Sequence, residues 1–533
     1  MLIVWPALDL RGTFISDEGS YGVQARALDR GSWDMGYAFS GEDPDGAFVP
    51  FHAATYVDGR LVPYAAHPAW TKAQVAATDL AGEEVGLRLF GVASLLGLAV
   101  VAWHLAAELG GPGAPAWAFW MAAASPALAN AWISWAHTPS AFLGGLLVLS
   151  ALRHDRGPWW AVAAVVSAGG GVLIRSEGLI WAGAVATALV LRGADRRQRW
   201  GGAVVGVGAG AALVLEREWR SRILGDPASS GVRPRGEGTG VVDRLDGLTT
   251  ALIDGAIASG PARALGLVLV VAMGAALVAF LRDRQDLAAG LLGLSSIVFG
   301  VRLAVESLDP APGLLAAAPL LLMACGWRPL RDGLRWLWWA IGLYVVMIGV
   351  TIYPDGGALQ WGGRFFSPLV APLGAAGGAF LASQLRAARG HRSIAAALTG
   401  TLCLALVVQA VGAVIVPERL RRLSQDGVEQ VAALGPSVVI ARGTQIPRLD
   451  WRSWPKRCWI SIPDGGGPDD ARAVLDVLAR SGVPRASYAG IDPDLLRTAG
   501  ASVTEGPDGY MIGTLDIEAA PNRRIAAPYR CDG

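Results

Sequence analysis

The sequence predicts an α-helical polytopic membrane protein with about thirteen transmembrane helices, followed by a small extracytoplasmic α/β domain. Of its 533 residues, 53% are hydrophobic and only 17% are charged, and the mean hydropathy is +0.41. A soluble protein needs more charge than this, so the default class is a membrane protein. Apolar stretches recur between residues 84 and 416, whereas residues 417–533 are polar and rich in proline. We therefore expect a transmembrane domain over residues 1–416 and a second domain over residues 417–533.

A series of apolar segments has the character of membrane spans. A further apolar run, Met1–Leu8, is too short to cross a bilayer, which takes about 20 residues. We expect there either a start site placed too late or a first helix that enters the bilayer only partly. With this piece the total is about thirteen spans, give or take about two. The complete segments lie at about 84–107, 115–134, 137–152, 158–174, 177–192, 199–215, 263–281, 286–306, 311–327, 334–353, 364–385 and 393–416.

The arginines between these segments predict the orientation of the chain in the plasma (inner) membrane. Alternate connections are rich in arginine, while those around Ala136, Asp309 and Gly356 carry almost no basic residues. Basic residues concentrate on the cytoplasmic side, so we expect the arginine-rich connections in the cytoplasm. The connection Gly110–Pro115 is an exception, because it should be cytoplasmic but has no Lys or Arg. The arginine-rich set is Arg153, Arg156, Arg192, Arg196, Arg197, Arg199, Arg282, Arg284, Arg328, Arg331, Arg335, Arg386, Arg389 and Arg392.

Three polar segments are then expected outside the cytoplasm: the loop 9–82, the loop 216–262 and residues 417–533. The first is a structured aromatic loop with a short helix near residues 20–28, since linkers are seldom so aromatic. In the last, Cys458 and Cys531 either form a disulfide in an oxidising compartment or remain free thiols. Its apolar runs predict strands at Val438–Ala441, Trp459–Ile462, Ala486–Ala489 and Tyr510–Thr514, and helices at Asp469–Ser481 and Pro493–Ala499.

Two adjacent carboxylates, Asp17 and Glu18, lie near the start of the external loop. Ionised carboxylates beside a membrane are energetically costly unless they are solvated, so we expect this pair to have a catalytic or structural role. A carboxylate at such a position can act as a general base that takes the proton from an acceptor hydroxyl. The structural alternative is a helix start in which Ser16 is the N-cap and the two acids favour the helix dipole.

Two histidines and a lysine are further candidates for substrate binding. At the end of the external loop, His67 could donate to a phosphate or sugar oxygen, and Lys72 could pair with a phosphate. The alternative for both is a solvated loop before the next span. His137 begins a span at the external face, where a lone histidine is more often structural than catalytic.

Two arginines occupy connections on the external side. Arg175 and Glu177 form a charged pair between two apolar segments, which suits either anion binding by Arg175 or an interfacial ion pair. Arg364 follows Trp361 and two glycines at the mouth of another span. A guanidinium bonds two oxygens at once, which makes Arg364 a candidate for binding a lipid-linked phosphate. The alternative is an arginine that extends toward the interface beside an aromatic belt.

Taken in order, these features resemble the GT-C superfamily of integral-membrane glycosyltransferases, especially the bacterial relatives of protein O-mannosyltransferases and lipid A aminoarabinose transferases. The resemblance covers roughly residues 10–380. The chain departs from the family in its short first span and in a C-terminal segment unlike a known carbohydrate-binding module. The matching stretches read FISDEGSYGVQARAL, YAAHPAWTKAQ before LRLFGV, SWAHTPSAF, LIRSEGL and QWGGRFFSPLVAPL.

The resemblance implies an extracytoplasmic active site and a hexosyl or pentosyl donor attached to a polyprenyl phosphate, transferred with inversion. It assigns the base to Asp17, with Glu18 as neighbour or substitute, and the lipid phosphate loosely to Arg175 and Arg364. The acceptor would be a glycan, lipid or protein of the cell envelope. No cofactor is expected, and a divalent metal is left open. The net charge of +1 gives no reason to expect a nucleic-acid partner.

Two other functions remain open from the sequence. A transporter or flippase for a lipid-linked or small solute would place ionisable residues at mid-span, whereas most charges here cluster at span ends. A non-catalytic scaffold would use the C-terminal domain to bind a partner, and the acidic pair would only cap a helix.

Overall fold

The computed structural model describes residues 13–51, 55–57, 59–64, 66–224, 240–253, 260–305, 313–329, 334–352, 362–433, 437–505 and 512–517. The chain divides into two compact units. Unit 1 comprises Met1–Gly86, Glu218–Arg233 and Leu420–Gly533, and unit 2 comprises Leu87–Arg217 and Pro234–Arg419. The N-terminal segment therefore groups with the C-terminal residues, whereas the sequence placed it with the membrane domain. The boundary expected at residue 416 falls inside one long helix, α16 (Arg392–Ala433).

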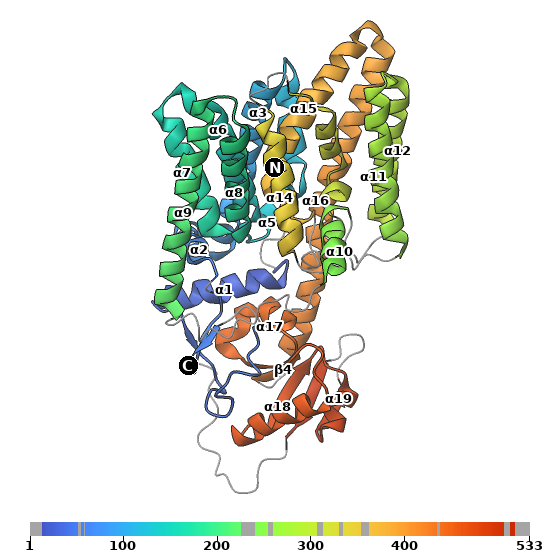
Figure 1. The fold of residues 1–533 in the computed structure, drawn as a ribbon. Helices are drawn as coiled ribbons and strands as arrows, with labels where there is room; N and C mark the ends of the chain where they lie inside the picture. The colour runs from blue at the N-terminus through green and yellow to red at the C-terminus, as the bar shows by residue number, and fades with distance from the viewer. Residues whose placement is uncertain are drawn as a thin grey trace. The chain divides into compact units, whose positions relative to one another are not determined.

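Unit 2 is built from the apolar helices (Figure 1). Among the described residues, five helices are long and apolar enough to cross a membrane. Several other expected spans are short or interrupted. Two of them are each divided into two short helices, and the second helix begins at Pro126 in one and at Pro319 in the other. The helices are α3 (Glu83–Leu109), α4 (Ala114–Ala123), α5 (Pro126–Trp132), α6 (His137–Arg153), α7 (Pro158–Ile174), α8 (Ser176–Arg192), α9 (Arg196–Leu224), α10 (Val241–Leu252), α11 (Gly260–Leu281), α12 (Gln285–Val305), α13 (Leu314–Ala317), η4 (Pro319–Gly326), α14 (Trp336–Thr351), η6 (Arg364–Leu369), α15 (Val370–Ala387) and α16.

The centre of unit 2 is α15, which is buried along most of its length. It packs closely on α4, where a Cβ at Gly378 would lie 2.7 Å from the backbone nitrogen of Ala118. Small residues allow this approach, as is usual between helices in membranes. Other helices are only partly covered, and α11 and α12 expose Val271 and Ile297. Because lipid is as apolar as these side chains, such faces are stable only in a bilayer.

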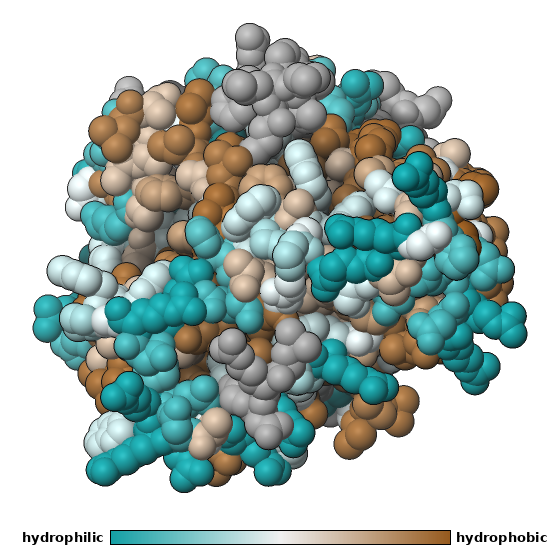
Figure 2. Space-filling model, turned by 90° about the horizontal axis from the view of Figure 1, so that it is seen from above, coloured by the Kyte–Doolittle hydropathy of each residue, from teal (hydrophilic) through white to brown (hydrophobic). Residues whose placement is uncertain are grey.

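Arginine-rich connections gather at one end of unit 2. Arg153 at the end of α6 donates to Glu108 at the end of α3 at 2.8 Å, and Arg156 donates to the same carboxylate at 2.6 Å. Arg386 at the end of α15 donates to the carbonyl of Pro112 at 2.7 Å. Figure 2 looks onto this end and shows hydrophilic side chains (teal) among hydrophobic ones (brown). These contacts explain the one exception to the charge pattern: the connection after α3 has no basic residue of its own, because neighbouring connections supply its arginines.

Unit 1 contains two sheets and several short helices (Figure 1). Its N-terminal part holds α1 (Ser16–Asp29), α2 (Pro68–Ala81) and a small antiparallel sheet of order β1-β3-β2, formed by Met35–Gly36, Arg60–Val62 and Thr55–Val57. The sequence expected a structured loop here but no strands. Strands this short carry no detectable alternation of apolar residues.

The second sheet has the order β5-β4-β6-β8-β7. Strands β5, β4 and β6 are parallel, and β8 runs antiparallel between β6 and β7. The elements are β4 (Val438–Arg442), α17 (Gln445–Leu449), η8 (Trp451–Lys456), β5 (Cys458–Ile462), α18 (Pro468–Arg480), β6 (Arg485–Ala489), α19 (Pro493–Thr498), β7 (Ser502–Glu505) and β8 (Ile512–Asp516).

Each expected strand and helix of this region has a counterpart among its described residues, where β7, α17 and η8 are additional elements. Val439, Ala441 and Trp459 belong to the buried core of the sheet. Cys458 is disulfide-bonded, and its expected partner Cys531 lies outside the described residues.

Candidate functional site

The first candidate residues lie on α1 in unit 1. The N-cap of this helix is Ile15 rather than the expected Ser16. Glu18 is buried, and its Oε2 accepts hydrogen bonds from the backbone N–H groups of Phe14 and Ile15. These bonds satisfy donors that have no partner within the helix. Glu18 therefore caps α1, which is the role expected from the sequence as the alternative to catalysis.

Asp17 makes a different contact. Its Oδ1 accepts a hydrogen bond of 3.0 Å from Nη1 of Arg448 on α17, although the two residues are 431 positions apart in the sequence. The side chain of Arg448 is 2% exposed, whereas that of Asp17 is 34% exposed. The carboxylate is thus held on one side by a buried cation and is open to solvent on another. No sequence motif predicted that Arg448 pairs with Asp17, because the pairing depends on the fold of the whole unit.

His67 and Lys72 lie close to aromatic rings of the same unit. His67 precedes α2, and its ring centroid is 6.2 Å from that of Tyr64. Tyr64 in turn meets Tyr21 of α1 edge-on at 4.6 Å. The Nζ of Lys72 lies 5.7 Å from the centroid of the Trp33 ring. A cation at this distance from an indole gains cation–π stabilisation. Lys72 therefore has a described partner other than the expected phosphate.

The remaining candidates belong to unit 2, where Arg175 and Glu177 join α7 to α8. Arg175 forms a two-pronged ion pair with Glu177, with Nη2 to Oε1 at 2.5 Å and Nε to Oε2 at 3.0 Å. The hydroxyl of Ser176 donates to Oε2 at 3.2 Å. The two charged side chains are only 11% and 6% exposed. The expected interfacial ion pair is therefore present, and it occupies the forked face of the Arg175 guanidinium.

Arg364 begins η6, which packs against α8, the helix that carries Glu177. Its guanidinium carbon is 5.0 Å from the centroid of Phe365 and 5.7 Å from that of Trp135. The ring of His137, at the start of α6, meets Trp135 edge-on at 4.8 Å. Unit 2 thus brings four predicted residues into one cluster: His137, Arg175, Glu177 and Arg364. We call it the arginine cluster.

Two arginines and one glutamate give the arginine cluster a net charge of +1 when His137 is neutral. Placed at the ends of apolar helices, such a group suits an anion with a lipid tail, because the head meets cations and the tail meets hydrocarbon. Trp361, the fifth predicted residue of this unit, lies outside the described residues. Within the part of the chain that the structure describes, no three His, Cys, Asp or Glu side chains form a metal-binding group.

Two features near the arginine cluster were interpreted differently or missed from the sequence. The glycines before Arg364 were expected to let backbone approach a ligand. Gly362 and Gly363 do have positive φ angles of 81° and 56°, but a Cβ at Gly363 would lie 2.0 Å from the carbonyl of Ala251. Close packing of the chain on itself therefore requires glycine there. The missed residue is Tyr344 of α14, whose hydroxyl donates to the carbonyl of Phe365; nothing distinguished it within an apolar segment.

Comparison with known proteins relates this arrangement to solved structures. No protein-family model and no curated protein sequence matches the chain. The crystal structure of ArnT from Cupriavidus metallidurans bound to undecaprenyl phosphate is 15% identical, covers 98% of both chains and gives a TM-score of 0.54. The same protein in the apo state is 15% identical, covers 98% of this chain and 97% of that one, and gives 0.53. The chain therefore shares its fold with ArnT.

The fold shared with ArnT extends further along the chain than the resemblance drawn from the sequence motifs. That resemblance covered roughly residues 10–380, whereas the structural likeness extends over nearly the whole chain, including the region after residue 417. An identity of 15% establishes the fold alone.

Proposed function

We propose that the protein is an inverting glycosyltransferase that moves a sugar from a polyprenyl-phosphate donor to an acceptor of the cell envelope. The observation that carries this proposal is the fold shared over 98% of both chains with a protein crystallised with undecaprenyl phosphate. The arginine cluster supports it independently, since it supplies cationic groups at the ends of apolar helices. The acceptor is a glycan, a lipid or a protein.

The reaction requires one bond to form and one to break. The oxygen of an acceptor hydroxyl attacks the anomeric carbon of the sugar, and the bond between that carbon and the phosphate oxygen breaks. The hydroxyl proton passes to a base, for which we propose Asp17, the more exposed of the two adjacent acids at the start of α1. The polyprenyl phosphate leaves with additional negative charge, which Arg364 and Arg175 stabilise. Glu18 caps α1 and takes no part in proton transfer.

We further propose that unit 1 lies outside the cytoplasm. The disulfide at Cys458 supports this, because disulfides persist in oxidising compartments and are rare in the cytosol. The grouping of arginines at one end of unit 2 supports the same orientation, since cytoplasmic connections are enriched in Lys and Arg. No observation specifically favours a transporter or a non-catalytic scaffold.

The test is transfer of label by membranes that contain the full-length protein. The donors are tritiated undecaprenyl-phosphate hexoses and pentoses, and release of undecaprenyl phosphate is followed by mass spectrometry. Asp17→Asn is expected to lower turnover by at least about 100-fold, because general-base catalysis contributes roughly that much. Asp29→Asn, at the exposed far end of the same helix, is the matched control and should retain turnover. Full activity of Asp17→Asn would refute the assignment of the base.

Measuring the binding of undecaprenyl phosphate distinguishes the proposed role of Arg364 from that of Asp17. Arg364→Met is expected to weaken binding of tritiated undecaprenyl phosphate by about 10-fold or more, because a hydrogen bond to a charged group is worth about 1.5–3 kcal/mol. Asp17→Asn should bind this lipid normally. Arg389→Met, an exposed arginine in the connection after α15, is the control for loss of charge. If both arginine variants bind equally well, the arginine cluster is not the phosphate site.

A further inference from the structure

The short helix α17 has a fixed place in unit 1 because it follows the central strand of the parallel sheet. Strand β4 pairs with both β5 and β6 and is buried. Gly443 then turns the chain with a φ of +63°, and its N–H donates to the carbonyl of Ile462 at 2.8 Å. The hydroxyl of Ser461 donates to the carbonyl of Gly443 at 2.6 Å. These two bonds attach the turn before α17 to β5.

Arg448 extends from this helix to α1. Its Nε donates to the carbonyl of Thr444 at 2.8 Å, and its Nη1 donates to Asp17 at 3.0 Å. The bond to Thr444 orients the guanidinium, and the bond to Asp17 joins it to one oxygen of that carboxylate. A buried arginine is costly without an anionic partner. Because Arg448 is 2% exposed, it holds Asp17 strongly in one orientation.

The segment 448–451, which begins within α17, packs against α1. Close approach is possible because Gly19 and Gly22 face it: a Cβ at Gly19 would lie 1.6 Å from the carbonyl oxygen of Arg448, and one at Gly22 would lie 2.6 Å from the Trp451 ring. The indole N–H of Trp451 donates to the hydroxyl of Thr13 at 3.1 Å. Substituting either glycine would therefore push α1 away from Arg448.

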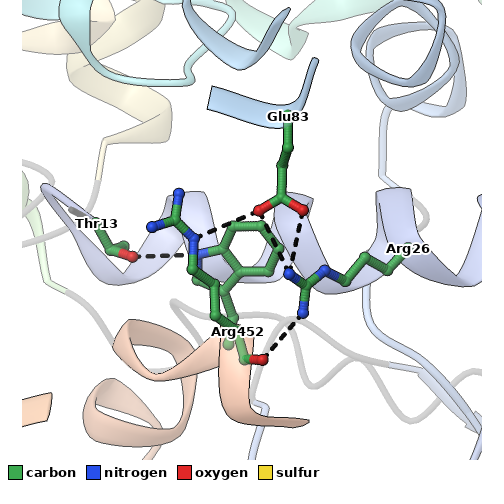
Figure 3. Close-up of polar contacts among 5 residues, drawn as sticks. Thr13, Arg26, Glu83 and Arg452 are labelled. Carbon is green, nitrogen blue, oxygen red and sulfur yellow. Dashed lines mark hydrogen bonds and ion pairs between the residues drawn. The ribbon is translucent and has the colours of Figure 1, made fainter. Parts of the chain in front are cut away.

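At the other end of α1, the charged side chain of Arg26 contacts Glu83 and the segment after α17 (Figure 3). The guanidinium of Arg26 lies 4.5 Å from the centroid of Trp451 and donates to the carbonyl of Arg452 at 3.1 Å. Arg26 and Arg452 also share the carboxylate of Glu83, at 3.1 Å and 3.4 Å. Thus both ends of α1 are tied to residues 448–452, and Asp17 has little freedom to turn.

We propose that Arg448 is a positioning residue for catalysis: it orients Asp17 and favours its ionised form, so that the carboxylate is ready to accept the acceptor's proton. This inference rests on the proposed role of Asp17 as the base. It gives the C-terminal segment a part in the reaction itself, beyond any recognition of the acceptor. The cation contacts one oxygen of the carboxylate, and the Asp17 side chain is 34% exposed.

The first test reads the protonation of Asp17 directly and needs no substrate. A water-soluble carbodiimide couples glycine ethyl ester to protonated carboxyl groups, and mass spectrometry of the full-length protein in nanodiscs gives the labelling of Asp17 against pH. Arg448→Met is expected to move the midpoint of labelling upward by at least about one pH unit, because a cation beside a carboxylate favours its charged form by that much or more. Arg448→Lys keeps the positive charge, so its labelling midpoint should lie close to that of the wild-type protein.

Other charged groups near α1 must be held constant in this experiment. They are Glu18 and Arg26 on α1, Asp450 and Arg452 in the segment after Arg448, and Glu83 at the start of α3. All variants are therefore made in an Asp450→Asn background, which removes a carboxyl that titrates near pH 6. Asp34, which pairs with the exposed Arg60 at 2.9 Å, is the internal control. Equal shifts at Asp34 and Asp17, or no shift at Asp17, would overturn the proposal.

The second test uses turnover with the undecaprenyl-phosphate donors. Arg448→Met is expected to lower kcat at least 10-fold with an unchanged KM and to move the acidic limb of the pH–rate profile to higher pH. If Arg448→Met does not fold, Arg448→Gln, which also removes the charge, carries the same test. Loss of melting temperature with an unchanged pH profile would mean that Arg448 is only structural. If Asp17→Asn retains turnover, the proposed base fails instead, and the labelling shift still reports on the pairing.

Discussion

At the scale of single residues, burial decides what an ionisable group can do. Asp17 and Glu18 are neighbours of the same charge, yet Glu18 is buried against backbone N–H groups and Asp17 reaches a cation from another element. The sequence could place both acids at a helix start but had no means to separate their roles. That separation depends on the packing of residues 13–15 over the helix end and on Arg448, far away in the chain.

Asp450 gives a prediction at this scale. It is 4% exposed, and burial raises the pKa of its carboxyl from 3.8 to about 6, although the Ser453 hydroxyl and Arg457 favour the charged form. The folded state therefore binds this proton more tightly than the unfolded state. Stability from this group is full below about pH 4 and falls by about 3 kcal/mol as the pH rises through about 6.

Asp450→Asn should remove this pH dependence while its amide oxygen still accepts from Ser453. We expect the variant to melt at a higher temperature than the wild-type protein at pH 7.5 and to lose that advantage at pH 4.5. The measurement is the melting temperature of the purified protein across this range, with Asp469→Asn, an exposed acid on α18, as the control. A constant difference between variant and wild type at every pH would contradict the assignment.

At the scale of elements, periodicity and hydropathy predicted most helices and strands within a few residues. The failures share a cause, which is that a local pattern does not report where an element stops. Expected spans at 115–134 and 311–327 are broken at Pro126 and Pro319, and α16 continues through Pro417, which the sequence treated as a boundary. The strands β1 to β3 are too short to show a pattern at all.

The junction of α7 and α8 provides the prediction at this scale. Glu177 is the described anionic partner of Arg175 in an apolar junction, so Glu177→Gln should destabilise the protein by about 3–5 kcal/mol by leaving a buried arginine uncompensated. Arg175→Met with Glu177→Leu removes both charges and should recover most of that loss. The measurement is the melting temperature in detergent by intrinsic fluorescence.

The control for this pair is Glu218→Gln, which breaks an exposed ion pair with Arg222 of 2.9 Å on α9. Exposed pairs of this kind contribute about 0–1 kcal/mol, so its melting temperature should barely change. If the double variant at residues 175 and 177 is as unstable as Glu177→Gln alone, then the two charges do not act as a pair. If the double variant does recover stability, any loss of its transfer activity reflects the missing charges rather than unfolding.

At the scale of the whole molecule, the composition was enough to predict a multi-span membrane protein, and its fold is shared with ArnT. What could not be predicted is that unit 1 is assembled from three separated stretches of chain. Contacts such as Asp17 with Arg448 join opposite ends of the sequence, and no periodicity or motif spacing reports them. The ion pair of Arg175 with Glu177, by contrast, was one of the predicted alternatives, because α7 and α8 follow one another directly.

The orientation of the whole molecule is the last prediction. It is tested with single cysteines in a background in which the free thiols Cys325 and Cys403 are replaced by serine. Asp469→Cys on α18 has a 98% exposed site, and Ala387→Cys is exposed at the end of α15, beside the arginine-rich connection. A membrane-impermeant maleimide should label Asp469→Cys in intact spheroplasts and Ala387→Cys only after permeabilisation. Complete labelling of both in detergent is the control, and the reverse pattern in intact cells would place unit 1 in the cytoplasm, where the disulfide at Cys458 would not persist.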